Sequence, residues 1–151
     1  MPSVVIRELS ASDIAAMHDL LTVFGEGFED TETYGAARPD DAYLKKLLAS
    51  DTFIALAAIS DGQVVGGLAA YVLEKFEQAR SEVYIYDLAV LEKHRRQGVA
   101  TALIEHLKGI ARTHGAWVIF VQADHGDAPA IALYESLGSR EDVLHFDIAV
   151  E

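Results

Sequence analysis

The stretch that decides the fold is Leu88-Ala89-Val90 together with the later Arg95-Arg96-Gln97-Gly98-Val99-Ala100-Thr101. Its first part ends an apolar strand pattern, and its second part opens a run with apolar residues at helical spacing. A helix N-terminus presents unpaired backbone N–H groups and the positive end of the helix dipole, so it binds phosphate. Gly98 and Ala100 are small enough for a ligand to approach the backbone, and Arg95 and Arg96 add positive charge. The stretch therefore predicts a phosphate-binding strand–turn–helix, to which Thr101 adds a hydroxyl.

Two nucleotide-binding motifs do not fit this turn. The chain has no Gly-x-x-x-x-Gly-Lys-Ser/Thr sequence, which argues against a P-loop. It also lacks the Gly-x-Gly-x-x-Gly fingerprint of a dinucleotide-binding fold at this place. An ordinary basic helix start explains the same residues without any ligand, because short glycine motifs often arise by chance.

The rest of the chain alternates between strand and helix patterns. We predict helices after the capping box Ser10–Asp13, after Asp40, from Gly98 to Gly115 and from Asp127 to Leu137. Strands are predicted at 4–6, 52–59, 64–73, 82–91, 117–122 and 143–150. Helices mixed with a mostly antiparallel central sheet, and one strand-to-helix crossover, predict an α/β (α+β) sandwich with about four helices. We expect one domain over residues 1–151.

Periodicity also assigns side chains to faces. The second helix is expected to bury Tyr43, Leu44, Leu47 and Leu48. Alternation along residues 82–91 is expected to place Glu82, Tyr84 and Tyr86 on one face and Asp87 on the other.

Charge indicates the kind of partner. The chain has 12 Lys and Arg against 24 Asp and Glu, a formal net charge of −12, which disfavours nucleic acid and anionic membranes and attracts cations. The same acidity also fits a protein that is merely soluble. There is no cysteine, and the six histidines lack ligand spacing, so we predict no metal site. No apolar run approaches the ~18 residues of a membrane span and no signal peptide is evident, so we expect a cytoplasmic protein.

The residues of this turn also resemble the signature of a known protein family. Arg95-Arg96-Gln97-Gly98-Val99-Ala100 resembles the R/Q-x-x-G-x-G/A signature of the GNAT superfamily of N-acetyltransferases, and it follows a strand, as in that family. Ala130-Ile131-Ala132-Leu133-Tyr134-Glu135-Ser136-Leu137-Gly138 resembles the family's second coenzyme-binding helix. The resemblance covers nearly the whole chain. Closer similarity is to the class I aminoglycoside 3-N-acetyltransferases, over residues 51–58, 75–82, 84–90, 121–124 and 145–148.

The resemblance implies acetyl-coenzyme A (acetyl-CoA) as co-substrate. Main-chain N–H groups of Arg96 through Thr101 would hold its pyrophosphate, and its pantetheine arm would lie along Leu88 to Val90. An N–H near Ala89 or Val90 would stabilise the oxyanion. The residues expected to contact the coenzyme are Leu88, Ala89, Val90, Arg95, Arg96, Gln97, Gly98, Val99, Ala100, Thr101, Asp127, Ala130 and Tyr134. For Asp127, helix capping explains the residue without a ligand.

The resemblance also implies that the amine attacks the thioester directly in a ternary complex. Tyr134 aligns with the tyrosine that protonates the leaving thiolate in many members, although it also fits a core-facing stripe with Ile131 and Leu137. A carboxylate must deprotonate the incoming ammonium. Some polyamine-acetylating relatives have a glutamate where Tyr86 stands. We expect Asp124 to be the base, because it follows the strand 117–122 where the sheet should open toward the acceptor, with Glu82 and Asp87 as alternatives. A solvated or capping carboxylate also explains each of the three.

The expected acceptor is an aminoglycoside, acetylated at the 3-amino group of its 2-deoxystreptamine ring and so inactivated as an antibiotic. A polycation calls for several carboxylates and for aromatic rings against its sugars. The expected acceptor residues are Glu26, Glu29, Asp30, Tyr84, Tyr86, Asp124, Glu141, Asp142 and Asp147. The family usually forms homodimers. Two other functions remain open: acetylation of a polyamine or peptide N-terminus, and a non-catalytic acyl-CoA sensor, because a fold does not prove chemistry.

Overall fold

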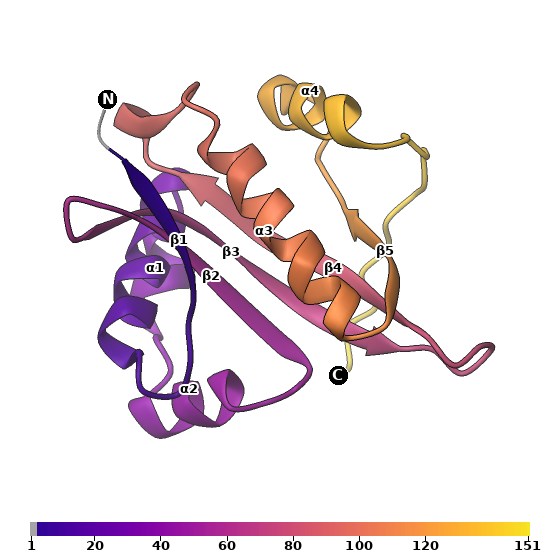
Figure 1. The fold of residues 1–151 in the computed structure, drawn as a ribbon, viewed down its shortest axis with the longest axis horizontal. Helices are drawn as coiled ribbons and strands as arrows, with labels where there is room; N and C mark the ends of the chain where they lie inside the picture. The colour runs from indigo at the N-terminus through magenta and orange to yellow at the C-terminus, as the bar shows by residue number, and fades with distance from the viewer. Residues whose placement is uncertain (1–2) are drawn as a thin grey trace.

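Within the residues that the structure describes, the chain forms a five-stranded sheet covered by helices (Figure 1). The computed structural model describes residues 3–151. Its elements are β1 (Val4–Glu8), α1 (Ile14–Gly27), the π-helix η1 (Glu32–Ala36), α2 (Asp41–Leu48), β2 (Phe53–Ser60), β3 (Gln63–Glu74), β4 (Ser81–Val90), the short 3-10 helix η2 (Glu92–His94), α3 (Val99–Thr113), β5 (Ala116–Val121) and α4 (Ala128–Leu137). No helix in this range is long and apolar enough to cross a membrane.

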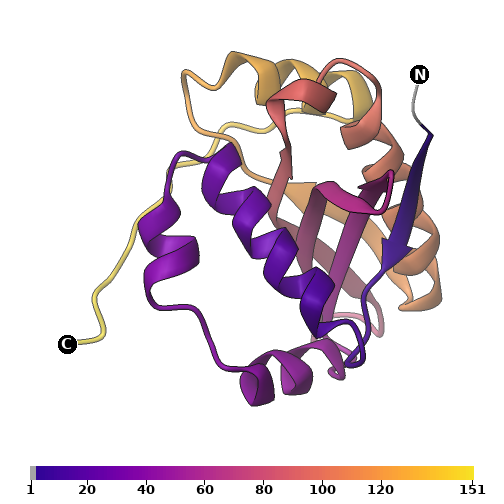
Figure 2. The same ribbon diagram turned by 90° about the vertical axis from the view of Figure 1, so that its left-hand side faces the viewer.

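The sheet is mostly antiparallel, as the sequence predicted. Its strand order is β1-β2-β3-β4-β5, with antiparallel pairing up to β4 and a parallel β4–β5 pair. Parallel strands require a crossover, and α3 provides it. α1 and α2 cover one face and α3 the other, as Figure 2 shows. Two cores result, one between the sheet and α3, and one between the sheet and α1 with α2.

The helix predictions are confirmed with two differences. Asp40 accepts a hydrogen bond from the backbone N–H of Tyr43 at 2.9 Å and begins α2 as expected, but the Tyr43 side chain is 59% exposed instead of buried. The Tyr43 side chain points to solvent because the buried face of this short helix consists of Leu44 and Leu48. At α1, the Asp13 carboxylate accepts a hydrogen bond from the backbone N–H of Ser10 at 2.7 Å. The reciprocal bond is missing, because no side chain accepts from the first N–H groups of the helix. Only one half of the predicted capping box forms.

The predicted last strand at 143–150 is wrong for this structure. Residues 139–151 form no helix or strand, and their apolar side chains are exposed, Val150 fully so. The alternating sequence has the pattern of a strand, but a strand needs a neighbour for its backbone N–H and C=O groups. No other strand of residues 3–151 pairs with this segment. We call it the C-terminal segment.

The prediction that Asp87 lies on the opposite face from Tyr84 and Tyr86 is also wrong, because a β-bulge interrupts the alternation of side chains along β4. The register between β3 and β4 passes from Ala69↔Asp87 to Ala70↔Ile85, which leaves Tyr86 as an extra residue. A bulge places two successive residues opposite one on the partner strand. Asp87 therefore lies on the α1 side of the sheet, like Tyr84 and Tyr86, while Leu88 joins the core under α3.

Candidate active site

The turn before α3 has the geometry of an anion site. Gly98 is the N-cap of α3 with φ of 80°, in the left-handed region that favours glycine, and Arg96 also has a positive φ of 61°. The first helical bond runs from Ala102 N–H to Gly98 C=O at 2.9 Å. The N–H groups of the preceding three helical residues, 99–101, therefore have no helical acceptor. A Cβ built on Gly98 meets nothing within 4 Å, so the space in front of the turn is open.

The side chains of the basic turn do not all face this space. Arg95 donates from Nε to the carbonyl oxygen of Val90 at 2.9 Å and so fixes the end of β4 to the turn. Gln97 donates from its amide to Lys93 C=O at 3.3 Å. Arg96 is exposed. The backbone amides, more than the arginine side chains, therefore offer the directed donors.

One backbone edge of β4 is unpaired beside the turn, because β5 ends before β4 does. The β4–β5 register stops at Ile85↔Val121, while β4 continues to Val90. Residues 86–90 thus keep one backbone edge without a β5 partner. Such an edge offers N–H and C=O groups to an extended ligand. The open edge leads from the turn to Asp87.

Tyr134 on α4 is half-buried and packs against the core under α3. Burial raises the pKa of its hydroxyl, and the charge of Asp127 raises it further, so the group stays protonated at neutral pH. Asp127 accepts from the backbone N–H of Ala130 at 3.3 Å and caps α4, as predicted from the sequence. Ala130 lies in the first turn of this helix.

Asp87 is the most enclosed of the three carboxylates considered as the base. It is half-buried and accepts a hydrogen bond from the Tyr34 hydroxyl at 3.1 Å. Burial raises the pKa of Asp87, and the Tyr34 hydrogen bond lowers it by a smaller amount. Asp124 is exposed in the loop after β5, and Glu82 accepts from the indole N–H of Trp117 at 3.0 Å. The geometry favours Asp87 for proton transfer near the open edge, and Asp124 and Glu82 stay predictions.

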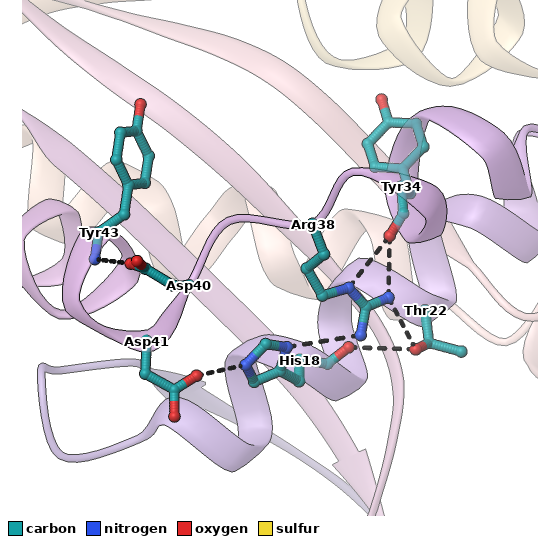
Figure 3. Close-up of polar contacts among 7 residues, drawn as sticks. All are labelled: His18, Thr22, Tyr34, Arg38, Asp40, Asp41 and Tyr43. Carbon is teal, nitrogen blue, oxygen red and sulfur yellow. Dashed lines mark hydrogen bonds and ion pairs between the residues drawn. The ribbon is translucent and has the colours of Figure 1, made fainter.

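Tyr34 is held in place by a polar network that joins α1, η1 and α2 (Figure 3). Arg38 donates from Nε and Nη2 to the Tyr34 carbonyl oxygen at 3.2 and 2.8 Å, and from Nη2 to Thr22 Oγ1 at 3.2 Å. His18 contacts Asp41 at 2.8 Å on α2. Arg38 thereby holds the main chain at Tyr34, whose hydroxyl donates to Asp87.

Aromatic rings form a row on the α1 side of the sheet beside Asp87. Ring centroids lie 5.9 Å apart for Tyr71 and Tyr86, 5.6 Å for Tyr86 and Tyr84, and 4.6 Å for Tyr84 and Phe120, which stack face to face. Tyr86 is 62% exposed. We call these four residues the aromatic row. It includes the predicted Tyr84 and Tyr86 and offers flat surface to a sugar ring.

The other predicted acceptor residues lie on separate elements. Glu26 and Glu29 are exposed at and after the end of α1, and Asp30 accepts from the backbone N–H of Thr33 at 3.1 Å. Hydrogen bonds from Thr33 lower the pKa of Asp30. Glu141, Asp142 and Asp147 lie on the exposed C-terminal segment, where Asp142 pairs with Arg140 at 2.8 Å and Asp147 with His145 at 2.9 Å. In residues 3–151 no group of three metal-ligating side chains occurs.

Three residues of the site had no signal in the sequence analysis: Tyr34, Tyr71 and Phe120. Tyr34 precedes Asp87 by 53 positions and reaches it only through the fold. Tyr71 lies opposite Tyr84, and Phe120 beside it, in the strand register. If the strand register had been known, it would have identified Tyr71 and Phe120 as neighbours of Tyr84.

Known proteins are similar to this chain in sequence and in fold. Residues 14–138 match the model of the family described as Acetyltransferase (GNAT) family. The structure of an aminoglycoside acetyltransferase from an uncultured soil metagenomic sample is 60% identical, with a TM-score of 0.97 and 99% of each chain covered. A second such enzyme from a soil metagenomic sample, in complex with sisomicin, is 32% identical, with a TM-score of 0.91 over 98% of this chain and 97% of that one. An uncharacterized N-acetyltransferase of Bacillus subtilis (strain 168) is 27% identical over 91% of this chain and 90% of its own length.

Proposed function

The chain belongs to the GNAT acetyltransferase family, and on that premise we propose that it transfers an acetyl group from acetyl-CoA to an amino group of an aminoglycoside. The observation that carries the choice of acceptor is the 60% identity to an aminoglycoside acetyltransferase over 99% of both chains. The site adds support, because an open anion-binding turn, an enclosed carboxylate and an aromatic row meet along one strand.

The residues at the turn suit a coenzyme with a pyrophosphate. The free N–H groups of residues 99–101 and the α3 dipole would bind its negative charge, and Gly98 leaves the approach open. Val90 is held by Arg95, so the open edge of β4 is fixed relative to the turn. When bound, the coenzyme supplies an acetyl thioester. A backbone N–H of Ala89 or Val90 would donate to the oxyanion, a contribution of typically ~3–4 kcal/mol.

Asp87 and Tyr134 would carry the two proton transfers. The acceptor arrives as an ammonium ion, and Asp87 takes its proton directly or through one water. Burial makes Asp87 a stronger base than an exposed aspartate, and Tyr34 keeps its carboxylate oriented. Tyr134 stays protonated and gives its proton to the thiolate as that forms. We therefore propose Asp87 as the base in place of Asp124, which was expected from the sequence.

The acceptor would lie along the aromatic row with its ammonium groups near carboxylates. Tyr86 and Tyr84 would contact sugar rings, and Glu26, Glu29 and Asp30 would supply negative charge from the end of α1. The net charge of −12 increases the encounter rate with a polycation. The resemblance to the 3-N-acetyltransferases suggests the 3-amino group of deoxystreptamine. We also propose that the chain works as a homodimer.

A thiol-release assay tests this function against the alternatives. The chain is incubated with acetyl-CoA and, in separate samples, with sisomicin, spermidine or a peptide with a free N-terminal alanine. We expect the highest kcat/KM with sisomicin. A higher value for spermidine or the peptide would assign the enzyme to another amine. Binding of acetyl-CoA without thiol release in any sample would indicate a sensor.

A further inference from the structure

The main chain of Tyr34 carries a hydrogen-bond acceptor that its own helix does not satisfy. η1 is a π-helix, in which each C=O group pairs with the N–H five residues on, and it ends at Ala36. Five residues after Tyr34 stands Pro39, which has no N–H. Because the last carbonyl groups of a helix need donors from elsewhere, the Tyr34 C=O depends on a partner outside η1.

Arg38 supplies this partner with two of its nitrogens. Its Nε and Nη2 donate to the Tyr34 carbonyl oxygen at 3.2 and 2.8 Å, and Nη2 also donates to Thr22 Oγ1 at 3.2 Å. The Thr22 hydroxyl donates in turn to the C=O of His18 at 3.1 Å, within α1. A planar guanidinium bound at several points has a fixed orientation, which a lysine ammonium would not reproduce. The Tyr34 main chain is therefore tied to α1 through one side chain.

The third nitrogen of the guanidinium is oriented from α2 through His18, as Figure 3 shows. Nη1 of Arg38 lies 3.5 Å from His18 Nδ1, and His18 Nε2 lies 2.8 Å from Asp41 Oδ1. A guanidinium can only donate and a carboxylate can only accept, so a neutral His18 with its proton on Nε2 satisfies both contacts. Two helices thus orient Arg38 toward Tyr34.

We propose that Arg38 is a positioning residue for acetyl transfer, because it fixes the Tyr34 main chain where the Tyr34 hydroxyl donates to Asp87 at 3.1 Å. In this role, which rests on the proposed function, Asp87 is the base and Arg38 acts on it through Tyr34. The Tyr34 ring packs separately against Phe24 and Phe28, at centroid distances of 5.9 and 5.6 Å. Loss of Arg38 therefore loosens the hydroxyl without removing the ring from its place.

The effect on Asp87 follows from the groups that face it. Burial raises the pKa of Asp87, and the hydrogen bond from Tyr34 on η1 lowers it. The other titratable side chains beside it are Tyr71 on β3 and Tyr84 and Tyr86 on β4. Tyrosines are neutral at acidic pH, so their charge does not change where Asp87 titrates. Removal of Arg38 should therefore raise the pKa of Asp87, and loss of the whole Tyr34 bond sets the upper limit of that rise.

The coupling is tested on the full chain without coenzyme, by following the NMR signal of the Asp87 carboxyl carbon through an acid titration. The signal is identified by its absence in Asp87→Asn. We expect Arg38→Met and Tyr34→Phe each to raise the pKa of Asp87, the first by up to about 10-fold in the ionisation constant. The double variant should shift it no further than Tyr34→Phe alone. Arg112→Met, a matched change at an exposed arginine in the last turn of α3, should leave it unchanged.

Two results would overturn the positioning role of Arg38. One is an Asp87 titration that Arg38→Met leaves unchanged. The other is a double variant in which the two single shifts add in full, because Arg38 would then act without Tyr34. Circular dichroism checks folding. If Arg38→Met does not fold, Arg38→Lys decides in the same way, since it keeps the charge and loses the two-point contact with the carbonyl.

Thiol release with sisomicin across the pH range tests the consequence for the reaction. Arg38→Met should lower kcat/KM by up to about 10-fold at acidic pH and little at alkaline pH, where Asp87 is ionised in either case. An equal loss at every pH would show a merely structural role and contradict the inference. If the full-length protein acetylates no aminoglycoside while the Asp87 titration shifts as expected, the proposed function fails and the coupling of Arg38 to Asp87 stands.

Discussion

Replacement of Tyr34 by phenylalanine isolates the hydrogen bond to Asp87. The ring contacts of Tyr34 with Phe24 and Phe28, at centroid distances of 5.9 and 5.6 Å, remain, and the O–H donor at 3.1 Å from Asp87 is lost. Hydrogen bonds to charged groups contribute ~1.5–3 kcal/mol, and this one is longer than the roughly 2.5–2.7 Å of the strongest O–H···O⁻ bonds. We therefore use the lower end, ~1.5 kcal/mol, which is about a factor of 10 in the ionisation of Asp87.

The sign of the pH effect follows from the causes of the Asp87 pKa. Burial raises that pKa and the Tyr34 hydroxyl opposes the rise, so Tyr34→Phe raises it further. The active carboxylate is then lost at a higher pH. At acidic pH kcat/KM should fall about 10-fold, and at alkaline pH, where Asp87 is ionised in both proteins, it should be nearly unchanged.

The assay is thiol release from acetyl-CoA with sisomicin across the pH range. Tyr43→Phe is the matched control, because it removes a hydroxyl from an exposed tyrosine on the neighbouring α2 and should leave the profile unchanged. An equal loss at every pH would mean that Tyr34 only shapes the site. An unaltered profile would refute the role of Asp87 as base.

Four further changes test other parts of the site and fold. Gly98→Asp should abolish coenzyme A binding in calorimetry, since it places a carboxylate where phosphate would bind, while Gly109→Asp, at an open position later in α3, should not. Tyr134→Phe should lower kcat roughly 100-fold and change the acceptor KM little; unchanged turnover would exclude it as the proton donor. Asp87→Asn should reduce turnover more than Asp124→Asn, and the opposite order would make Asp124 the base. Asp13→Asn should lower the free energy of unfolding by under ~1 kcal/mol at neutral pH and by less as acid protonates Asp13, because the Ser10 N–H lowers its pKa in the folded state; a constant difference in urea denaturation would contradict this.

The sequence predicted most of the fold because its signals are local. The apolar spacing of α3, the Asp40 and Asp127 caps and the turn at Gly98 depend on residues close together in the chain. The family resemblance then placed the strands in order, and the family is confirmed.

What the sequence missed depends on contacts between distant residues. The β-bulge at Tyr86 is a property of the β3–β4 pairing, and it reverses the face on which Asp87 lies. The hydrogen bond between Tyr34 and Asp87 joins η1 to β4. The segment 143–150 has the alternation of a strand, but a strand also needs a paired neighbour, and alternation does not guarantee one.

Analysis of the acetylated product tests the central claim most directly. Sisomicin is incubated with acetyl-CoA and the protein, and the product is examined by mass spectrometry and by NMR to locate the new amide. We expect one acetyl group per sisomicin molecule, on an amino group of the deoxystreptamine ring, and none with the Gly98→Asp variant. Unmodified sisomicin in the presence of folded protein that binds acetyl-CoA would contradict the proposed acceptor.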